Sequence, residues 1–377
     1  NEILFLKKFA ELKRQQSLAK IIAITGSAGK TSLKNLIRQL LQNFEKTYSS
    51  PRSFNNHFGV PISLSNLSVE DKYGIFEVGM SKTGEIKNLS KLIKPHIGII
   101  TNIGEAHIEN FKNINGIAKA KAEIIDNIKE DGTIILNRDD RFFRYFHQKA
   151  KLKKLKIVTF GKDKKSDVYP LRIIKKKNLI KIYVKVKNQK IVLDIKDINK
   201  YNLLASLAVV KELGLDINVT KNTFKNYELT EGRGKTHLIS RYNKKFKLID
   251  ESYNANPLSV KNAIINFNLI KKKKFKKYLI LGDMLELGHK SEKYHKDLSK
   301  VINNTDIDKV FIKGEKILFT YKYLNKSKRG NILQNKDDID SILRSIIANK
   351  DYLMIKGSNA TGLNAISKKM IKGLNVI

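Results

Sequence analysis

The residues best suited to chemistry lie in a short glycine loop, TGSAGKTS, at positions 25–32. The usual phosphate-binding loop has four residues between its first Gly and its Gly-Lys pair, whereas Gly26 and Gly29 enclose only two. Small residues let backbone N–H groups approach an anion, and a helix beginning at Lys30 adds its positive dipole end and a full charge. Thr31 would place a hydroxyl on Mg²⁺. The loop predicts nucleotide binding in preference to a plain turn between strand and helix.

Three further side chains could do chemistry beside this loop. Glu77 lies at the end of the strand predicted within YGIFEVG. The carboxyl edge of a parallel sheet faces the ligand crevice, so a metal role and a salt bridge to Lys both stay open. His107 follows the next apolar stretch, where an imidazole could bind a metal or serve only as a polar loop residue. Lys121, taken alone, is most simply a charge on a helix surface.

The elements that must position these residues follow from apolar periodicity. After the loop, apolar residues from Leu33 to Phe44 recur at helical spacing, and short apolar runs at 73–79, 97–104 and 132–137 predict buried strands of a parallel sheet. The stretch 168–195 alternates apolar and polar residues, which predicts an antiparallel subsheet. We therefore predict an α/β fold with a P-loop parallel-sheet ATPase domain at 1–232.

A second domain should follow a polar, glycine-containing linker at 229–237. Beyond it the four stretches KFKLIDES, KYLILGDM, DKVFIKG and DYLMIKGS are short apolar runs, each followed by helix-like sequence. This order predicts a Rossmann-like C-terminal α/β domain at 233–377.

Composition narrows the class of protein. The chain has no Cys, which excludes disulfides and thiolate sites and indicates a reducing cytoplasm. The net charge of +38 comes from 63 Lys and only 11 Arg, spread along the chain, a balance that favours compositional drift over nucleic-acid recognition. No apolar run approaches the roughly 20 residues of a membrane span.

Taken together, these stretches resemble the Mur ligases, ATP-dependent amide-forming enzymes of peptidoglycan synthesis that carry a short TGxxGKT loop. Within that family they are most similar to the members that add D-alanyl-D-alanine to UDP-MurNAc-tripeptide. The resemblance runs from Ile21 to about Ser358 and is carried by FNNHFGVPISL, FEVGMSKTGEI, TNIGEAHIENF, AKAKAEI, ILNRDD, DESYNANPLSV and LILGDMLELG. It implies ATP and two Mg²⁺ sites as cofactors, those two substrates as partners, an acyl-phosphate intermediate, and a cytoplasmic monomer that binds no nucleic acid.

The resemblance also implies roles for single residues. Lys30 would bind the ATP phosphates, Thr31 with Glu77 would hold one Mg²⁺, and His107 would hold the second together with Lys121, which is carbamylated (N6-carboxylated) in this family. Asn202 would lie by the base, Arg233 would reach the phosphates, and Asp250 with Glu251 would meet the ribose or the linker to it. The full set implied for catalysis and nucleotide binding is Thr25, Gly26, Ser27, Ala28, Gly29, Lys30, Thr31, Ser32, Glu77, His107, Lys121, Asn202, Arg233, Asp250, Glu251, Asn254 and Asn256.

The chain departs from the family pattern at several places. The family's N-terminal uridine-nucleotide domain is expected to be lacking, because the chain begins just before the ATP domain. Tyr201 and Ala205 stand where His and Asn are usual, Glu251 stands in place of Asp, and Asn359 replaces a basic residue. The alternatives are another Mur-type ligase, a folylpolyglutamate or cyanophycin synthetase, a basic nucleic-acid-binding protein, and an inactive fragment that still binds ATP.

Overall fold

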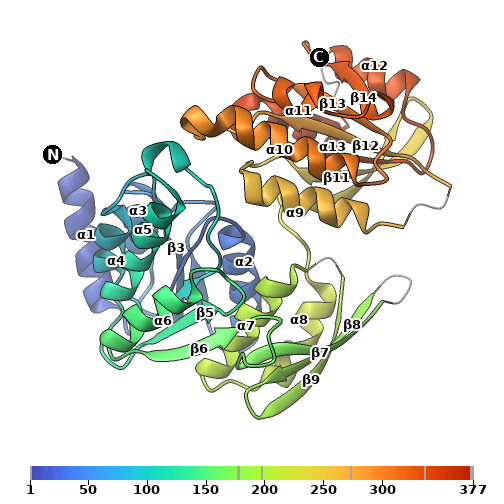
Figure 1. Ribbon diagram of the computed structural model, residues 1–377. Coiled ribbons are helices and arrows are strands. Elements are labelled where there is room, and N and C mark those ends of the chain that lie inside the picture. The colour runs from blue at the N-terminus through green and yellow to red at the C-terminus, as the bar shows by residue number, and fades with distance from the viewer. Residues whose placement is uncertain (1, 176–178, 197, 272–273, 335–336, 374–377) are drawn as a thin grey trace. The chain divides into compact units, whose positions relative to one another are not determined.

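The computed structural model describes residues 2–175, 179–196, 198–271, 274–334 and 337–373, which form two compact units (Figure 1). The N-terminal unit comprises the chain up to Gly104 together with Phe111–Glu228. The C-terminal unit comprises Leu229 onward together with the short segment Glu105–Asn110.

A nine-stranded sheet with the order β2-β3-β1-β4-β5-β6-β7-β8-β9 forms the centre of the N-terminal unit. The first six strands in this order are parallel. In β1, β3, β4 and β5 every residue is buried except the first of β1, as expected for a sheet covered on both faces. These six are β1 (Lys20–Thr25), β2 (Thr47–Ser49), β3 (Tyr73–Glu77), β4 (Ile97–Ile100), β5 (Thr133–Asn137) and β6 (Lys156–Phe160).

The helices of this unit lie on both faces of the sheet, with α1, α3, α4 and α5 gathered on one side and α2 and α7 on the other (Figure 1). The stripe predicted after the glycine loop is confirmed up to Leu41, since α2 buries Leu33, Leu36, Ile37, Leu40 and Leu41, whereas Phe44 lies in the turn beyond the helix. The bounds are α1 (Glu2–Gln16), α2 (Lys30–Leu41), α3 (Gly59–Ser65), α4 (Glu85–Ile93), α5 (Ile114–Asp126), α6 (Phe143–Leu152), α7 (Lys200–Glu212) and α8 (Lys221–Asn226).

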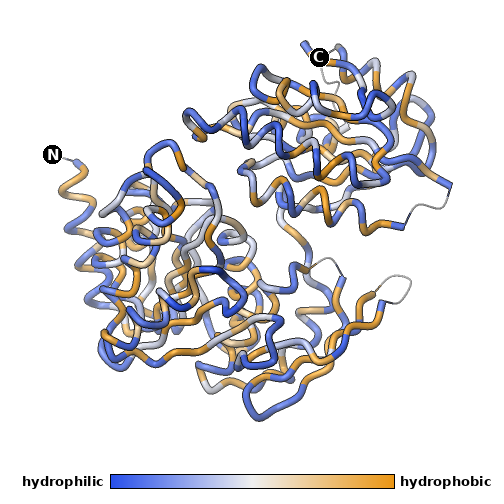
Figure 2. The backbone as a smooth tube through the Cα atoms, in the orientation of Figure 1, coloured by the Kyte–Doolittle hydropathy of each residue, from blue (hydrophilic) through white to orange (hydrophobic). Residues whose placement is uncertain are grey.

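Three antiparallel strands extend this sheet: β7 (Val168–Lys175), β8 (Ile180–Val186) and β9 (Gln189–Ile195). Alternate residues of β8 and β9 are buried, which is the pattern that predicted a subsheet here. Residues 176–178, within the predicted stretch, lie outside the described residues. Figure 2 shows apolar segments running through the interior of each unit and hydrophilic segments over its outer turns.

The C-terminal unit has a six-stranded sheet with the order β10-β11-β15-β12-β13-β14, parallel except for the pair β10 and β11. The four predicted strands appear as β11 (Lys244–Glu251), β12 (Lys277–Gly282), β13 (Lys309–Lys313) and β15 (Tyr352–Lys356), so the predicted α/β class is confirmed for both units. The remaining elements are β10 (Lys235–Arg241), α9 (Pro257–Asn268), α10 (Ser291–Asn303), α11 (Leu318–Lys322), β14 (Arg329–Ile332), α12 (Asp337–Ser345) and α13 (Leu363–Ile371).

The order of the first sheet fixes where a ligand can bind. From β1 the chain runs to β2 and β3 on one side and then to β4 and β5 on the other, so the connections diverge at the carboxyl end of β1. Open α/β sheets bind ligands in the crevice at such a point. The glycine loop lies there. No helix in the described part of the chain is long and apolar enough to cross a membrane.

Candidate nucleotide-binding site

The glycine loop joins β1 to α2 and needs both of its glycines. Gly26 has φ 146° and Gly29 has φ 84°, values that residues other than glycine rarely adopt. A Cβ on Gly26 would also lie 1.9 Å from Thr101 Oγ1, a clash that no small shift would relieve. Because Gly26 has no side chain, the loop can lie directly against the residues that follow β4.

Those residues hold the loop through several hydrogen bonds. The N–H of Ser27 donates to the Asn102 carbonyl, and the N–H of Ala28 donates to Asn102 Oδ1, both at 2.9 Å. The Ala28 carbonyl accepts from Thr101 Oγ1 at 2.8 Å. Such fixed backbone geometry at a helix N-terminus suits a phosphate group.

Two of the predicted residues, Lys30 within the loop and Asn202 outside it, donate hydrogen bonds to carbonyl groups of the loop glycines. Lys30 folds back so that its Nζ donates to the Gly26 carbonyl at 2.8 Å, which keeps the ammonium beside the loop. Asn202 of α7 lies against Gly29, with Nδ2 donating to the Gly29 carbonyl at 3.4 Å. The structure therefore brings Asn202 to the loop although 173 residues separate it from Gly29.

Thr31 and Glu77 meet directly beneath the loop. Thr31 Oγ1 donates to Glu77 Oε2 at 2.7 Å and lies 3.2 Å from Ser53 Oγ, while Asn55 Nδ2 donates to Glu77 Oε1 at 2.7 Å. Glu77 is 2% exposed. Hydroxyl and carboxylate oxygens are the ligands that Mg²⁺ takes in proteins, and this cation needs only one or two of them beside phosphate and water. The residues present fit a magnesium ion.

Lys121 of α5 is a buried residue and not the surface charge that its helix alone suggests. It is 2% exposed, and burial lowers its pKa well below the ordinary value for lysine. Repulsion from Lys30 lowers the pKa further, whereas the Glu77 carboxylate raises it. Lys121 is therefore near enough to Lys30 and Glu77 to be affected by both charges, and burial favours its neutral amine.

Sequence reasoning missed the residues that hold this site from behind. Lys34, one turn after Lys30, is buried, and its Nζ donates to the carbonyls of Ser50, at 2.5 Å, and Arg52. These contacts fix the segment that carries Ser53 and Asn55. The signal in the sequence was a lysine on the buried face of an amphipathic helix, a position that lysine occupies only when its ammonium is paired.

Tyr201, which stands where the family pattern has His, bonds to the ILNRDD motif. Its hydroxyl donates to Asp139 Oδ2 at 3.0 Å, and Lys162 Nζ lies 5.4 Å from the ring centre. Burial first, and then the Asp139 carboxylate, raises the pKa of Tyr201 to about 12. Ala205, at the other changed position of this helix, is buried in the core.

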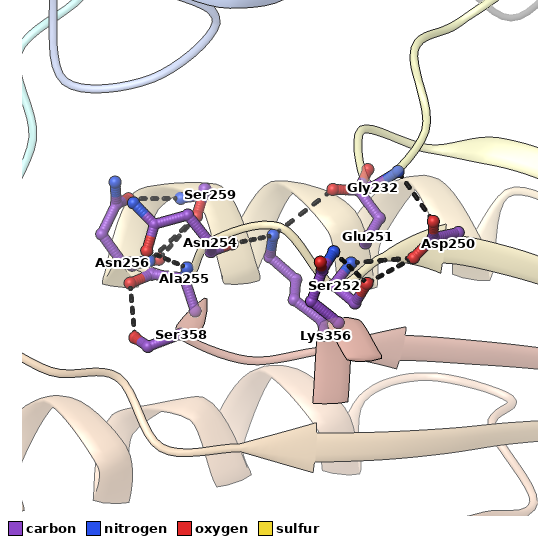
Figure 3. Close-up of polar contacts among 11 residues, drawn as sticks. Gly232, Asp250, Glu251, Ser252, Asn254, Ala255, Asn256, Ser259, Lys356 and Ser358 are labelled. Carbon is purple, nitrogen blue, oxygen red and sulfur yellow. Dashed lines mark hydrogen bonds and ion pairs between the residues drawn. The ribbon is translucent and has the colours of Figure 1, made fainter. Parts of the chain in front are cut away.

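In the C-terminal unit, Asp250 at the end of β11 organises the turn that carries Arg233 (Figure 3). Its carboxylate accepts from the Gly232 N–H at 2.7 Å and from Ser252 Oγ at 2.5 Å. The Arg233 guanidinium lies 4.1 Å from the centre of the Tyr253 ring. Asp250 is 1% exposed, so it shapes the turn from inside.

The rest of the DESYNANP segment leads into α9. Glu251 Oε2 and the Asn254 carbonyl both lie against Lys356 Nζ, at 3.3 and 3.1 Å. Asn256 is the N-cap of α9, because its Oδ1 accepts from the Ser259 N–H at 2.9 Å while Ser259 Oγ accepts from the Asn256 N–H. Asn359 lies in an exposed single turn after β15.

His107 belongs to the segment that groups with the C-terminal unit. Its backbone is left-handed, with φ 58°, and its Nδ1 lies 2.6 Å from Glu286 Oε2, within the LILGDMLELG motif. The contact with His107 lowers the pKa of Glu286. The predicted pairing of His107 with Lys121 stays a prediction.

Comparison with known proteins decides the family. The family described as Mur ligase middle domain matches residues 24–210, and the one described as Mur ligase, glutamate ligase domain matches residues 236–359. The UDP-N-acetylmuramoyl-tripeptide--D-alanyl-D-alanine ligase of Rickettsia prowazekii is 32% identical over 96% of this chain and 80% of that protein. The chain belongs to the Mur ligase family. The predicted resemblance is confirmed.

Two further Mur ligases extend the comparison over nearly the whole chain. The enzyme of the same name from Buchnera aphidicola subsp. Baizongia pistaciae is 30% identical over 99% of this chain and 80% of that protein. A crystal structure of MurF from Acinetobacter baumannii has a TM-score of 0.87 and 26% identity, covering 98% of this chain and 80% of that one. The fold described above is therefore the Mur ligase fold.

The site of this Mur ligase contains few conventional metal ligands. Among the described residues, no group of three or more His, Cys, Asp and Glu side chains is placed to hold a metal ion. The Glu77 carboxylate accepts a hydrogen bond from Thr31, and its charge raises the pKa of Lys121. A metal ion here would need the Thr31 hydroxyl, the Glu77 carboxylate and phosphate oxygens as ligands, together with any ligand that a modified Lys121 supplies.

Proposed function

We propose that this chain is the Mur ligase that joins D-alanyl-D-alanine to UDP-MurNAc-tripeptide at the expense of ATP, in peptidoglycan synthesis. The observation that carries the proposal is the match to relatives of that name along 96–99% of the chain, through both units. Other Mur-type ligases and folylpolyglutamate or cyanophycin synthetases, which use other acceptors, share the glycine loop but are less favoured by these matches. The basic charge of the chain is spread too widely to favour nucleic acid.

The reaction needs a carboxylate to attack a phosphate, and both are anions. The terminal carboxylate of the tripeptide attacks the γ-phosphorus of ATP, which forms an acyl phosphate and releases ADP. The amine of D-alanyl-D-alanine then attacks the acyl carbon, and the amide forms as inorganic phosphate leaves and the amine loses a proton. Lys30 and the N-terminus of α2 would stabilise the negative charge on the transferred phosphoryl group.

Thr31 and Glu77 would hold one Mg²⁺ on the nucleotide phosphates, since their oxygens lie 2.7 Å apart and fit its preference for hard ligands. When bound, this ion would screen the repulsion between the tripeptide carboxylate and the γ-phosphate. Asn55 and Ser53 keep Glu77 and Thr31 in place from the adjacent segment. These contacts hold the Thr31 hydroxyl and the Glu77 carboxylate in place beside the loop.

Lys121 would carry a carbamate that, with His107, holds a second Mg²⁺. A neutral amine is required to add CO₂, because the nitrogen lone pair forms the new C–N bond and one N–H proton is then lost. Burial and the nearby Lys30 favour that neutral amine. The product is an anionic oxygen pair, which converts a residue that repels Mg²⁺ into one that binds it.

In the C-terminal unit, Arg233 would reach the ATP phosphates. Asp250 with Glu251 would meet the ribose or the linker to it, Glu251 through its own carboxylate and the buried Asp250 through the turn that it holds. Asn254 and Asn256 would lie by the nucleotide and the incoming dipeptide. These roles are supported by the hydrogen bonds that fix the side chains of Asp250, Glu251, Asn254 and Asn256 in the DESYNANP segment (Figure 3).

The test is phosphate release from ATP by this chain with UDP-MurNAc-tripeptide, with and without D-alanyl-D-alanine. We expect release that needs both substrates, together with the amide product by mass spectrometry. Release that responds to glutamate or another acceptor in place of the dipeptide would contradict the proposed acceptor. ATP-independent, salt-sensitive retention of RNA or DNA that survives Lys30→Ala would point instead to nucleic-acid binding.

A further inference from the structure

Lys356 is a buried cation that nothing above assigns to the reaction. It is the last residue of β15, which lies between β11 and β12 in the middle of the second sheet. Its side chain is 3% exposed. A buried ammonium costs free energy unless it is paired and hydrogen-bonded, so its partners show what it is for.

Both partners of Lys356 belong to the DESYNANP segment (Figure 3). Nζ lies 3.3 Å from Glu251 Oε2 and donates to the Asn254 carbonyl at 3.1 Å. Glu251 and Lys356 are also direct neighbours in the parallel register of β11 and β15. One ammonium therefore fixes a side chain and a main-chain carbonyl three residues further on.

The carboxylate of Glu251 is confined from the other side as well. A Cβ on Gly234 would lie 3.0 Å from Glu251 Oε1, and Gly234 has φ 97°, so a glycine leaves room for that oxygen. The Glu251 side chain is 26% exposed, in contrast to Lys356. Its carboxylate is thus held at the surface between a buried cation and a glycine turn.

We propose that Lys356 is a positioning residue for nucleotide binding, which holds the Glu251 carboxylate and the Asn254 backbone where the ribose of ATP meets the C-terminal unit. The inference rests on the proposed function. It also explains the exchange of Asp for Glu at position 251, because the longer side chain carries its carboxylate to Lys356 while an aspartate would end one carbon short.

A second buried lysine of the same sheet offers a matched control. Lys277 is the first residue of β12, fully buried, and pairs with Asp306 at 2.7 Å. In the register of β12 and β15, Lys277 lies opposite Tyr352 and Leu281 lies opposite Lys356, so the two lysines are at opposite ends of adjacent strands. Replacing Lys277 should disturb the fold of this unit without touching the DESYNANP segment.

The experiment measures binding of a non-hydrolysable ATP analogue, β,γ-imido-ATP, to the full chain by calorimetry, with thermal unfolding of each variant. We expect Lys356→Met to weaken binding about tenfold or more, because one charge-assisted contact is lost. Lys356→Arg should recover part of the affinity. Lys277→Met should lower the melting temperature and leave the dissociation constant unchanged.

A double-mutant cycle separates positioning from general loss of structure. Once Lys356 is Met, Glu251→Gln should add little further loss, since the two side chains act as one unit. Equal losses of affinity in Lys356→Met and Lys277→Met, or wild-type affinity in a folded Lys356→Met, would overturn the inference while the ligase assay still stands. A wild-type chain that neither binds the analogue nor releases phosphate would overturn the proposed function, and this role with it.

Discussion

Thr31 and Glu77 are joined by a hydrogen bond of 2.7 Å from the threonine hydroxyl to the carboxylate. Thr31 lies in the first turn of α2, and Glu77 is the last residue of β3, directly beside β1 in the sheet. The fold therefore brings a hydroxyl and a carboxylate from separate elements to the base of the glycine loop. Their mutual bond fixes the direction of both oxygens before any ligand arrives.

Removing this hydroxyl should weaken binding of Mg-ATP more than it weakens the fold. Thr31→Val keeps the shape of the side chain but removes a proposed Mg²⁺ ligand and leaves Glu77 without one of its partners. Metal affinity should therefore fall at least as far as the roughly 10–100-fold that is typical when an orienting contact alone is lost. Titration of the ATP analogue with and without Mg²⁺ measures the effect. Thr31→Ser, which keeps the hydroxyl, should bind almost normally. Equal Mg²⁺ dependence in the valine variant and the wild type would refute a metal role for this pair.

Activity should depend on dissolved CO₂ through Lys121. Burial lowers the pKa of Lys121 and so favours the neutral amine that forms a carbamate. Preparation in CO₂-free buffer should reduce phosphate release, and bicarbonate should restore it. A Lys121→Ala enzyme should be impaired and should not respond to bicarbonate. Intact-protein carbon-13 NMR with labelled bicarbonate should show a carbamate signal in the wild type alone. A wild-type enzyme indifferent to CO₂ would exclude the modification.

The fold and the loop could be predicted because their signals are local. The apolar stripe of α2, the buried runs of the parallel strands and the alternation in β8 and β9 each follow from a repeat of a few residues. The strands β10 and β14 gave weaker signals, since both are edge strands with much exposed surface. Edge strands with so few buried residues have no periodic pattern strong enough to distinguish them from loops.

The supporting residues of the site could not be predicted, because their partners are distant in the sequence. Lys34 binds carbonyls 16 and 18 residues away, and Lys356 reaches Glu251 across 105 residues. The apolar face of α2 indicates that Lys34 is buried, but nothing in the local sequence says which groups receive its hydrogen bonds or that Lys356 is buried. His107 is similar, because its neighbour Glu286 belongs to a motif in the other half of the chain.

The geometry of Gly26 should make it far less replaceable than another glycine with positive φ. Gly26→Ala would force a Cβ to within 1.9 Å of Thr101 Oγ1, whereas a Cβ on Gly84 at φ 89° would meet nothing within 4 Å. Gly84→Ala should cost only the backbone strain, about 1–2 kcal/mol in the free energy of unfolding. Gly26→Ala should cost more and abolish binding of the ATP analogue.

A second-site change tests that explanation for Gly26. Thr101→Ala removes the hydroxyl that the new Cβ would strike, so the double variant should regain part of the stability lost in Gly26→Ala. Denaturant unfolding of the four proteins, wild type included, gives the comparison. If Gly26→Ala and Gly84→Ala were equally stable and bound the analogue equally well, the close approach of loop and Thr101 would not matter for function.

Acid should destabilise the N-terminal unit through His96. Its Nδ1 accepts a hydrogen bond from the Ile21 N–H at 2.9 Å, which requires the neutral ring. Burial lowers the pKa of His96 to about 4, and the nearby cations Lys129, Arg14 and Lys20 contribute in the same direction. In the unfolded chain the pKa returns to its ordinary value of about 6.5. Between these values the unfolded state binds the proton and the folded state does not.

The free energy of unfolding should therefore fall as the pH drops from about 6.5 to 4, by no more than about 2 kcal/mol for this group once solvent screening is allowed for. His96→Asn keeps an acceptor for the Ile21 N–H but cannot titrate, so its stability should fall less steeply over the same range. Other histidines titrate in both proteins, and the difference between the two curves isolates His96. Parallel curves, or an NMR titration that places the His96 pKa near 6.5, would contradict the assignment.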